Sequence, residues 1–240
     1  MKTQDEFYLA NESNAFYERW LENPKQPKGQ LLRDSKKQIL NQISECLDVN
    51  NLKVLEVGCF IGDLLGHLKV NHGCEVHGIE SSSKACQHAM ENFDVKLENA
   101  TFAASSLFKL SEDNHEIFDL IICEDVLSWM SRDQILPILG VLDWMLTSGG
   151  SIFIRDFSPA FGFAYENHHC PGQNVYNFKQ PGGHRQFFLN TGKYVETSSY
   201  IRASGQYQKI DTGRPDSTIW ADSLITKCQG ALHPILPMDM

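Results

Sequence analysis

The chain has 240 residues, of which 42% are hydrophobic and 21% charged, and its formal net charge is −9 at pH 7. This length and composition fit one globular, soluble domain with a large core. Nucleic-acid binding needs clustered Lys and Arg, so the acidic balance argues against a nucleic-acid partner. The seven cysteines form no C-x-x-C pair, and there is neither a signal peptide nor a long apolar run. We therefore expect a reduced, cytoplasmic protein without a membrane partner, and its oligomeric state stays open.

The N-terminal segment, residues 1–29, is polar but carries several aromatic side chains. Phe16 and Trp20 share one helical face at the i, i+4 spacing, and a run with Pro and Gly ends this helix before residue 30. An amphipathic helix that includes Ile39 and Ile43 leads into the first strand. The aromatic residues of the first segment either fold over a bound ligand and help to exclude water, or pack across an edge of the sheet.

Residues 53–63 combine a strand, a glycine turn and the start of a helix. The apolar run that ends at Val57 suits a strand buried on both faces of a parallel sheet. Gly58 and Gly62 then interrupt the run, and leucines at helical spacing follow. This arrangement places free backbone N–H groups beside a pocket at the carboxyl end of the strand.

The spacing of this turn argues against a pyrophosphate ligand. A dinucleotide site needs G-x-G-x-x-G, whereas Phe60 takes the place of the second close-approach glycine. Glu56 is expected to point toward the turn, where a carboxylate repels a pyrophosphate and favours a cationic ligand. S-adenosylmethionine (SAM) has an ammonium and a sulfonium but no phosphate, and it fits. A plain strand-turn-helix connection is the alternative.

A second strand, residues 76–80, ends in an acid. Glu80 follows Gly58 at about 20 positions, where a carboxylate accepts hydrogen bonds from the two vicinal hydroxyls of a nucleoside ribose. Ser81 and Ser82 come directly before a helical run and are suited to cap it. A solvated glutamate at a strand end is the alternative interpretation of Glu80.

The pattern Glu56-x-Gly58-x-x-x-Gly62, together with Glu80, resembles the first motif and the ribose acid of the class I SAM-dependent methyltransferases. The resemblance covers roughly residues 30–227. It implies SAM as cofactor, with S-adenosylhomocysteine (SAH) as product. It also implies a cofactor-binding set formed by the first strand, its turn and the second strand: Glu56, Gly58, Cys59, Phe60, Gly62, Glu80 and Ser81.

Two further segments match the same family. Where the third strand should end, family members often carry an aspartate for the adenine amino group; here Ser106 and the backbone of Leu107 take that place. The fourth strand ends at Cys123 and Glu124, and the resemblance places this backbone against the methionine part of the cofactor. Trp129 either faces the sulfonium or belongs to the core.

Strand and helix patterns alternate through the middle of the chain, which implies parallel strands and crossover helices. The last two strands are joined by a loop and are therefore antiparallel to each other. We predict an α/β fold with a doubly wound, mostly parallel seven-stranded sheet, an antiparallel last strand and helices on both faces. The later elements predicted are a helix at 132–146, ended by Ser148 to Gly150, and strands at 151–157, 194–203 and 217–227. The chain is predicted to divide into a helical lid or cap at 1–29, a methyltransferase domain at 30–227 and a C-terminal tail at 228–240.

The segment 157–193 fits the family pattern least and is interpreted as a substrate-side insertion. It follows the fifth strand, so it begins at the carboxyl edge of the sheet, and it is rich in aromatic residues, histidines and glycines. Lys179 and Arg185 either bind an anionic part of a substrate or are solvated surface residues.

A hydroxyl acceptor must lose a proton on methylation, and histidine is the usual base near neutral pH. His168 and His169 are the candidates, with Asp156 as an orienting carboxylate; ordinary loop histidines are the alternative. Cys170 follows the two histidines, but no second pair of metal-binding residues accompanies this cluster, so no metal site is predicted.

These observations favour a SAM-dependent methyltransferase that acts on a small molecule, at an oxygen of a sugar or related metabolite. Methylation of protein or nucleic acid is a second hypothesis, which the acidic balance disfavours. A SAM-binding module without turnover is a third, and nicotinamide-linked oxidation is disfavoured by Phe60 and Glu56.

Overall fold

The computed structural model describes residues 4–23, 31–108, 112–159, 162–168, 170–179, 181–203 and 219–229. Its main feature is one mixed sheet of seven strands in the order β3-β2-β1-β4-β5-β9-β8. The strands are β1 (Lys53–Val57), β2 (Glu75–Glu80), β3 (Glu98–Asn99), β4 (Phe118–Glu124), β5 (Leu146–Phe157), β8 (Tyr194–Ala203) and β9 (Ile219–Lys227). Strands β1 to β5 pair in parallel, whereas β9 runs antiparallel to both β5 and β8. The predicted α/β fold with an antiparallel last strand is therefore confirmed.

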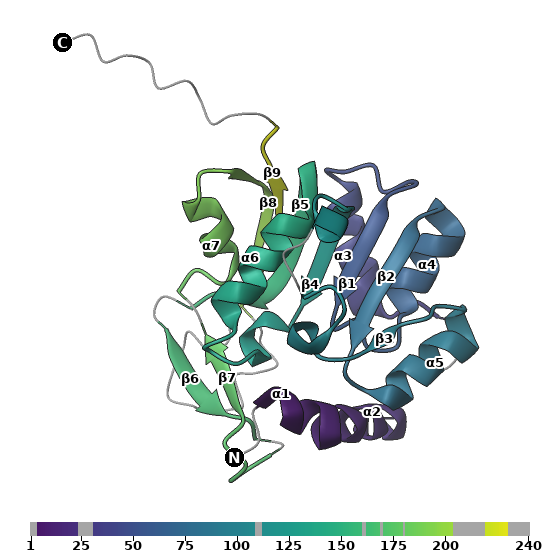
Figure 1. The fold of residues 1–240 in the computed structure, drawn as a ribbon, viewed down its shortest axis with the longest axis vertical. Coiled ribbons are helices and arrows are strands. Elements are labelled where there is room, and N and C mark those ends of the chain that lie inside the picture. The colour runs from purple at the N-terminus through teal and green to yellow at the C-terminus, as the bar shows by residue number, and fades with distance from the viewer. Residues whose placement is uncertain are drawn as a thin grey trace, which may run out of the picture.

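Helices cover both faces of this sheet (Figure 1). On one face, Val54, Leu120 and Phe153 of the sheet share a core with α3 (Asp34–Ser44), α4 (Asp63–His72) and α5 (Ser83–Phe93). On the other face, residues such as Leu55 and Ile121 pack against α6 (Ile135–Met145) and α7 (Arg185–Asn190). Because β1 and β4 are buried on both faces, they consist of nearly continuous apolar runs.

The structure differs from the prediction at the connection between α6 and β5 and within the insertion. Helix α6 ends at Met145, and β5 begins at Leu146 and runs through the two glycines that were predicted to end the helix. The insertion contains a separate two-stranded antiparallel sheet, β6 (Phe163–Glu166) and β7 (Tyr176–Lys179), followed by α7. The residues predicted to break the first helix, 24–29, and most of the C-terminal tail lie outside the described residues.

The N-terminal segment lies across the edge at which the parallel strands end (Figure 1). It consists of α1 (Gln4–Phe7), a π-helical turn (Tyr8–Glu12) and α2 (Ser13–Glu22). At one end, Asn14 Oδ1 accepts hydrogen bonds from Ser82 Oγ (2.9 Å) and Lys84 N (3.2 Å) at the start of α5. At the other end, Gln4 exchanges two hydrogen bonds with the backbone of Tyr176 in β7 (2.9 and 3.0 Å). The segment thus joins two elements on opposite sides of the sheet edge.

Candidate active site

A cavity of about 830 Å³ lies at the carboxyl edge of the parallel strands. This is where ligands bind in open α/β sheets, and the volume is within the range of small-molecule sites. Its wall contains the ends of β1, β2, β4 and β5, the start of β9, the N-terminal segment and the insertion. The cavity therefore joins parts of the chain that are far apart in the sequence.

The glycine turn after β1 forms one wall of the cavity. Gly58 (φ +71°), Phe60 (φ +54°) and Gly62 (φ +70°) all have left-handed backbone conformations. A Cβ added at Gly58 would lie 2.9 Å from Val126 Cγ2, so glycine is required there for space as well as for conformation. Phe60 is a bulky residue in this strained region, and its N–H is held by Glu80 Oε2 at 2.9 Å.

Glu80 ends β2 and lines the cavity. Its Oε1 accepts a hydrogen bond from Ser82 N at 2.7 Å and its Oε2 accepts the one from Phe60, so the two oxygens are fixed in direction. Burial raises the pKa of this carboxyl above its usual range, although the backbone N–H groups of Ser82 and Phe60 oppose the shift. Each oxygen keeps acceptor capacity for a ligand hydroxyl.

Aromatic rings of the N-terminal segment surround Phe60. The ring centroids of Phe16 and Trp20 each lie 5.3 Å from that of Phe60, and that of Tyr17 lies at 6.0 Å. The guanidinium of Arg33 covers the same ring at 5.1 Å. Phe16 remains half exposed and lines the cavity, so the N-terminal segment shields this end of the cavity from water.

A network of buried ion pairs underlies the cavity floor. Lys36 of α3 forms ion pairs with Glu56 of β1 and with Glu124 of β4, the latter at 2.5 Å. Arg155 of β5 bonds Glu124 at 3.0 Å and forms a two-bond pair with Asp222 of β9 at 2.8 and 2.9 Å. The network thus connects the adjacent strands β1, β4, β5 and β9 with helix α3.

The pKa values of the two glutamates in this network are shifted in opposite directions. Burial raises the pKa of Glu56 to about 7, because the nearby Lys36 offsets only part of the desolvation. Burial also acts on Glu124, but Lys36 and Arg155 outweigh it and lower its pKa to about 2. Glu124 is therefore the fully ionised partner, and Glu56 Oε2 has no hydrogen-bond partner among the described residues.

The predicted cofactor residues divide into two groups. Those found in the cavity wall are Gly58, Phe60, Glu80, Ser81 and Glu124. The others lie outside the wall: Glu56, Cys59, Gly62, Ser106, Leu107 and Cys123. Glu56 is fully buried and paired with Lys36 instead of facing the turn, and Ser106 donates from N and Oγ to Glu98 (2.6 and 2.9 Å).

The predicted catalytic residues are not assembled as one unit among the described residues. His168 lines the cavity, and His169 lies outside the described residues. Asp156 is buried and forms a hydrogen bond of 2.5 Å with Nδ1 of His184, a histidine that the sequence analysis did not assign. The catalytic roles of His168, His169 and Asp156 stay predictions.

The sequence prediction missed Asp125, whereas it named Lys179 as a candidate contact for an anionic part of a substrate. Asp125 directly follows β4, lines the cavity and has a left-handed backbone (φ +49°). Lys179 of β7 is 2% exposed, so it is neither a solvated nor a surface residue. Arg185 bonds Ser223 Oγ at 2.9 Å and pairs with Glu196 at 3.2 Å, outside the cavity wall. The only sequence signal for Asp125 was its place at a strand end, and the substrate contact predicted for Lys179 stays a prediction.

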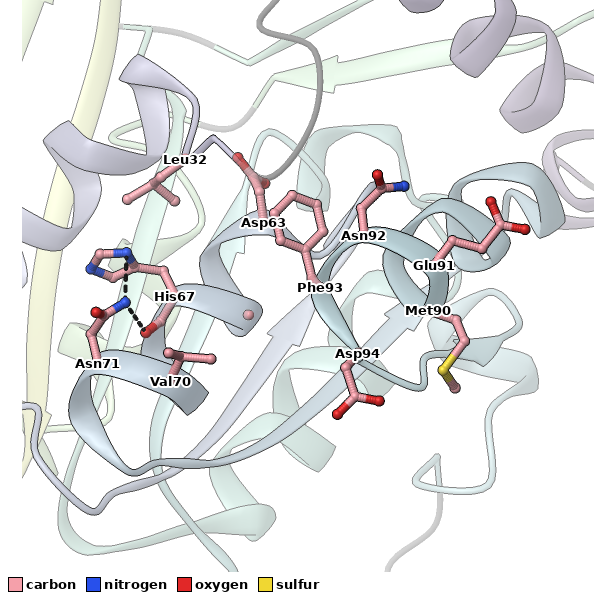
Figure 2. A pocket seen from close by; sticks show the side chains of 11 residues that line it. Leu32, Asp63, His67, Val70, Asn71, Met90, Glu91, Asn92, Phe93 and Asp94 are labelled. Carbon is pink, nitrogen blue, oxygen red and sulfur yellow. Dashed lines mark hydrogen bonds between the residues drawn. The ribbon is translucent and has the colours of Figure 1, made fainter.

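A second hollow, of about 370 Å³, lies between α4 and α5 on the side of the molecule (Figure 2). Its polar side chains are engaged in ordinary pairs. Asn71 donates to His67, Asp94 pairs with Lys69 at 2.8 Å, and Asp63 forms a two-bond pair with Arg33. The hollow shows no convergence of reactive groups comparable with the large cavity, which is therefore the candidate active site.

The large cavity fits SAM better than a metal ion. Gly58 leaves room that a side chain would fill, and the buried carboxylate of Glu80 is aimed into the cavity at the end of the second strand. Among the residues in the described ranges, no group of three or more His, Cys, Asp or Glu is placed to hold a metal. Every helix in those ranges is too short or too polar to cross a membrane.

Comparisons with known proteins agree with this assignment. The profile of a family described as a methyltransferase domain matches residues 48–201. An uncharacterised protein of Rickettsia prowazekii (strain Madrid E) is 31% identical over 104 residues, and the match spans only 41% of that protein and 42% of this chain.

Solved structures share the fold at low identity. They include 1,6-didemethyltoxoflavin-N1-methyltransferase of Burkholderia thailandensis, bound to 1,6-didemethyltoxoflavin and SAH (TM-score 0.61, 12% identity, 95% of this chain and 92% of that chain). The N-methyltransferase NodS of Bradyrhizobium japonicum WM9, bound to SAH, has a TM-score of 0.54 and 17% identity over 90% of this chain and 99% of that chain. Magnesium protoporphyrin IX methyltransferase of Synechocystis PCC 6803, bound to SAM, has a TM-score of 0.60 and 11% identity over 95% of this chain and 99% of that chain.

The α/β fold with its seven-stranded, mostly parallel sheet is shared with these methyltransferase structures. The chain belongs to the methyltransferase domain family, because the family profile covers more than half of it. The predicted methyltransferase class is therefore confirmed.

Proposed function

We propose that this protein transfers the methyl group of SAM to a small molecule, at a hydroxyl of a sugar or related metabolite. The observation that carries this proposal is the composition of the large cavity. One end has the glycine turn and Glu80, and the other end has aromatic rings and carboxylates from the N-terminal segment, from the residues after β4, and from β5, β6 and β9.

The aromatic end suits a polyhydroxylated acceptor. The rings in its wall are those of Tyr8, Trp129, Phe157, Tyr165 and Trp220. Flat apolar ring faces pack against the carbon faces of a sugar, while carboxylates accept hydrogen bonds from its hydroxyls. Asp5 and Asp125 supply such carboxylates in the same wall.

Two other observations favour a small acceptor over a macromolecule. The N-terminal segment crosses the sheet edge and contributes Tyr8, Ser13 and Phe16 to the cavity wall, which narrows access for a folded partner. Related structures include enzymes named for small acceptors, 1,6-didemethyltoxoflavin and magnesium protoporphyrin IX. The net charge of −9 gives no support to a nucleic-acid substrate.

When bound, SAM supplies an electrophilic methyl group on a sulfonium. The chain's residues position and shield it: Glu80 would accept from the ribose hydroxyls, and the glycine turn would face the nucleoside with backbone N–H groups. Phe60 and its aromatic neighbours exclude water from this end. Aligning acceptor, methyl and sulfur is mainly a proximity effect, which a preformed cavity provides.

The proposal is tested in two steps. Calorimetric titration with SAM, SAH and NAD should show binding of the first two and none of the third; binding of NAD alone would contradict the cofactor. SAH formation is then measured with monosaccharides, nucleotide sugars, polyols, phenols and primary amines as acceptor probes. Turnover with hydroxyl probes supports the proposal, and turnover with amines alone, or with none, overturns it.

A further inference from the structure

Two groups of opposite charge at the aromatic end of the cavity, where the acceptor is proposed to bind, each have a buried polar atom without a hydrogen-bond partner among the described residues. Asp125 Oδ1 and Lys179 Nζ are both buried, and neither has a hydrogen-bond partner among the described residues. Such groups are rare, because leaving a buried polar atom unsatisfied costs about 1–3 kcal/mol. Asp125 lines the candidate active-site cavity and Lys179 lies against two rings of its wall, so their occurrence at the same place asks for a functional explanation.

Geometry connects the two groups to the cavity. Asp125 lines it, and its strained left-handed backbone turns the residue away from the line of β4. Lys179 Nζ lies over the ring of Phe157 and 5.3 Å from the ring centroid of Tyr165, both of which line the cavity. Lys179 therefore lies directly behind the aromatic wall.

The charged groups around this pair come from three strands. Burial raises the pKa of Asp125, the charges of Asp156 and Glu124 raise it further, and Lys179 opposes the shift. Burial lowers the pKa of Lys179, and Asp156 and Asp125 oppose that shift. The pKa values of an aspartate and a lysine thus approach each other, which makes transfer of a proton between the neutral and charged forms accessible near neutral pH.

We propose that Asp125 accepts the proton that the acceptor hydroxyl loses, and that Lys179 is a positioning residue that keeps the Asp125 carboxylate ionised. This inference rests on the proposed function, because only a protic acceptor needs a base. As the acceptor oxygen forms its bond to the methyl carbon, the methyl–sulfur bond breaks and its electron pair stays on the neutral thioether sulfur. The O–H proton moves to the Asp125 carboxylate and is released to solvent once the products, a methyl ether and SAH, have left.

The first test needs no acceptor. Protein labelled with [γ-¹³C]aspartate is titrated by NMR, and the resonance absent from Asp125→Asn is assigned to Asp125. Its midpoint should lie near pH 7, should rise in Lys179→Met, and should return toward the wild-type value in Lys179→Arg, which retains the charge. A midpoint close to the ordinary value of about 3.9 overturns the inference, as does a midpoint that Lys179→Met leaves unchanged. Should Lys179→Met not fold, the wild-type midpoint decides alone.

The second test uses the best hydroxyl probe of the acceptor screen. Asp125→Asn should lower kcat by about 10²- to 10⁴-fold, the usual contribution of a positioned base, with SAM affinity within twofold of wild type. Asp48→Asn, a loop substitution distant from the cavity wall, is the matched control. Wild-type kcat in Asp125→Asn, or a large loss in His168→Ala with none in Asp125→Asn, overturns the inference. Absence of turnover in the wild-type protein instead counts against the proposed function, and the NMR titration remains decisive for the pair.

Discussion

The cofactor end and the acceptor end of the cavity are built in different ways. The cofactor end comes from adjacent strands and the turns that follow them, and its charged groups are paired: Glu80 with two backbone N–H groups, Lys36 with two glutamates. The aromatic end, where the acceptor is proposed to bind, combines residues that follow β4, residues of β5, β6 and β9, and the N-terminal segment, and Lys179 of β7 lies behind its wall. Asp125 Oδ1 and Lys179 Nζ have no hydrogen-bond partner among the described residues.

The difference has a physical reason. A cofactor that is the same in every cycle is served by a rigid, fully bonded wall, because preformed donors and acceptors need no reorganisation on binding. A group that must take up and release a proton cannot be fixed in one charge state by strong partners, since such partners move its pKa out of the working range. This contrast applies to Glu80 and to the proposed pair of Asp125 and Lys179; Glu56 Oε2, which belongs to the network beneath the cofactor end, also has no hydrogen-bond partner among the described residues.

The largest effect is expected where the cofactor end is most strongly paired. Lys36→Met would leave Glu56 and Glu124 without their shared cation, and breaking a buried ion pair from one side costs about 3–5 kcal/mol. The loss should appear as a lower free energy of unfolding in urea. Lys37→Met is the control, because Lys37 is exposed on the same helix and pairs only with Asp34. A stability of Lys36→Met equal to that of Lys37→Met would contradict the network.

The loss in Lys36→Met should also depend on pH. The pKa of Glu56 is already above the unfolded value of about 4.3, and without the cation it should rise further, while the pKa of Glu124 should rise from its low value. The folded state then binds more protons than the unfolded state, so its stability falls as pH increases through and above this value. The difference from wild type should therefore be larger at pH 8 than at pH 5; a constant difference would indicate that packing, and not charge, is lost.

The next effect concerns cofactor affinity. Glu80→Ala removes the acceptor assigned to two ribose hydroxyls, and losing hydrogen bonds to a charged group should weaken SAM binding about 100-fold, roughly 3 kcal/mol. Calorimetry measures this directly. Glu75→Ala, at the exposed beginning of the same strand, should leave affinity unchanged. Equal affinities in the two variants would remove the ribose assignment.

A smaller effect tests the glycine turn. Gly58→Ala adds a methyl group 2.9 Å from Val126 Cγ2 to a left-handed backbone, and strain plus overpacking should cost about 2–3 kcal/mol of unfolding free energy. Gly172→Ala is a matched control, because its backbone is also left-handed (φ +75°) but no atom lies within 4 Å of the added methyl. The steric part should be recovered in the double variant Gly58→Ala/Val126→Ala; failure to recover it would place the strain elsewhere.

The sequence predicted the fold, and it predicted five candidate cofactor residues that the structure places in the cavity wall, because these depend on local patterns. A buried strand, a turn that needs glycine and an acid at the next strand end lie close together in the chain, and parallel strands bring their carboxyl ends to one edge. Glu56 was misplaced because its partner, Lys36, comes from a separate helix, and an ion pair between distant residues leaves no periodic signal. The same holds for Asp125 and Lys179, which come together only because the β6–β7 hairpin folds back onto the end of β4. Asp156 was expected to orient the loop histidines, but its hydrogen bond goes to His184 at the start of α7.

The smallest effect concerns the N-terminal segment, which we propose acts as a lid over both ends of the cavity. Asn14→Ala removes the side chain that holds α2 to the start of α5, at an expected cost of about 1 kcal/mol. Because Asn14 is outside the cavity wall, this loss should appear first as faster amide hydrogen exchange in residues 8–22, about fivefold, with the sheet unchanged. Asn71→Ala, which disturbs only contacts within α4, should leave exchange of this segment at the wild-type rate. SAM should slow exchange in residues 8–22 of the wild-type protein if the segment closes over the cofactor; exchange that does not respond to SAM would make it a fixed part of the wall and not a lid.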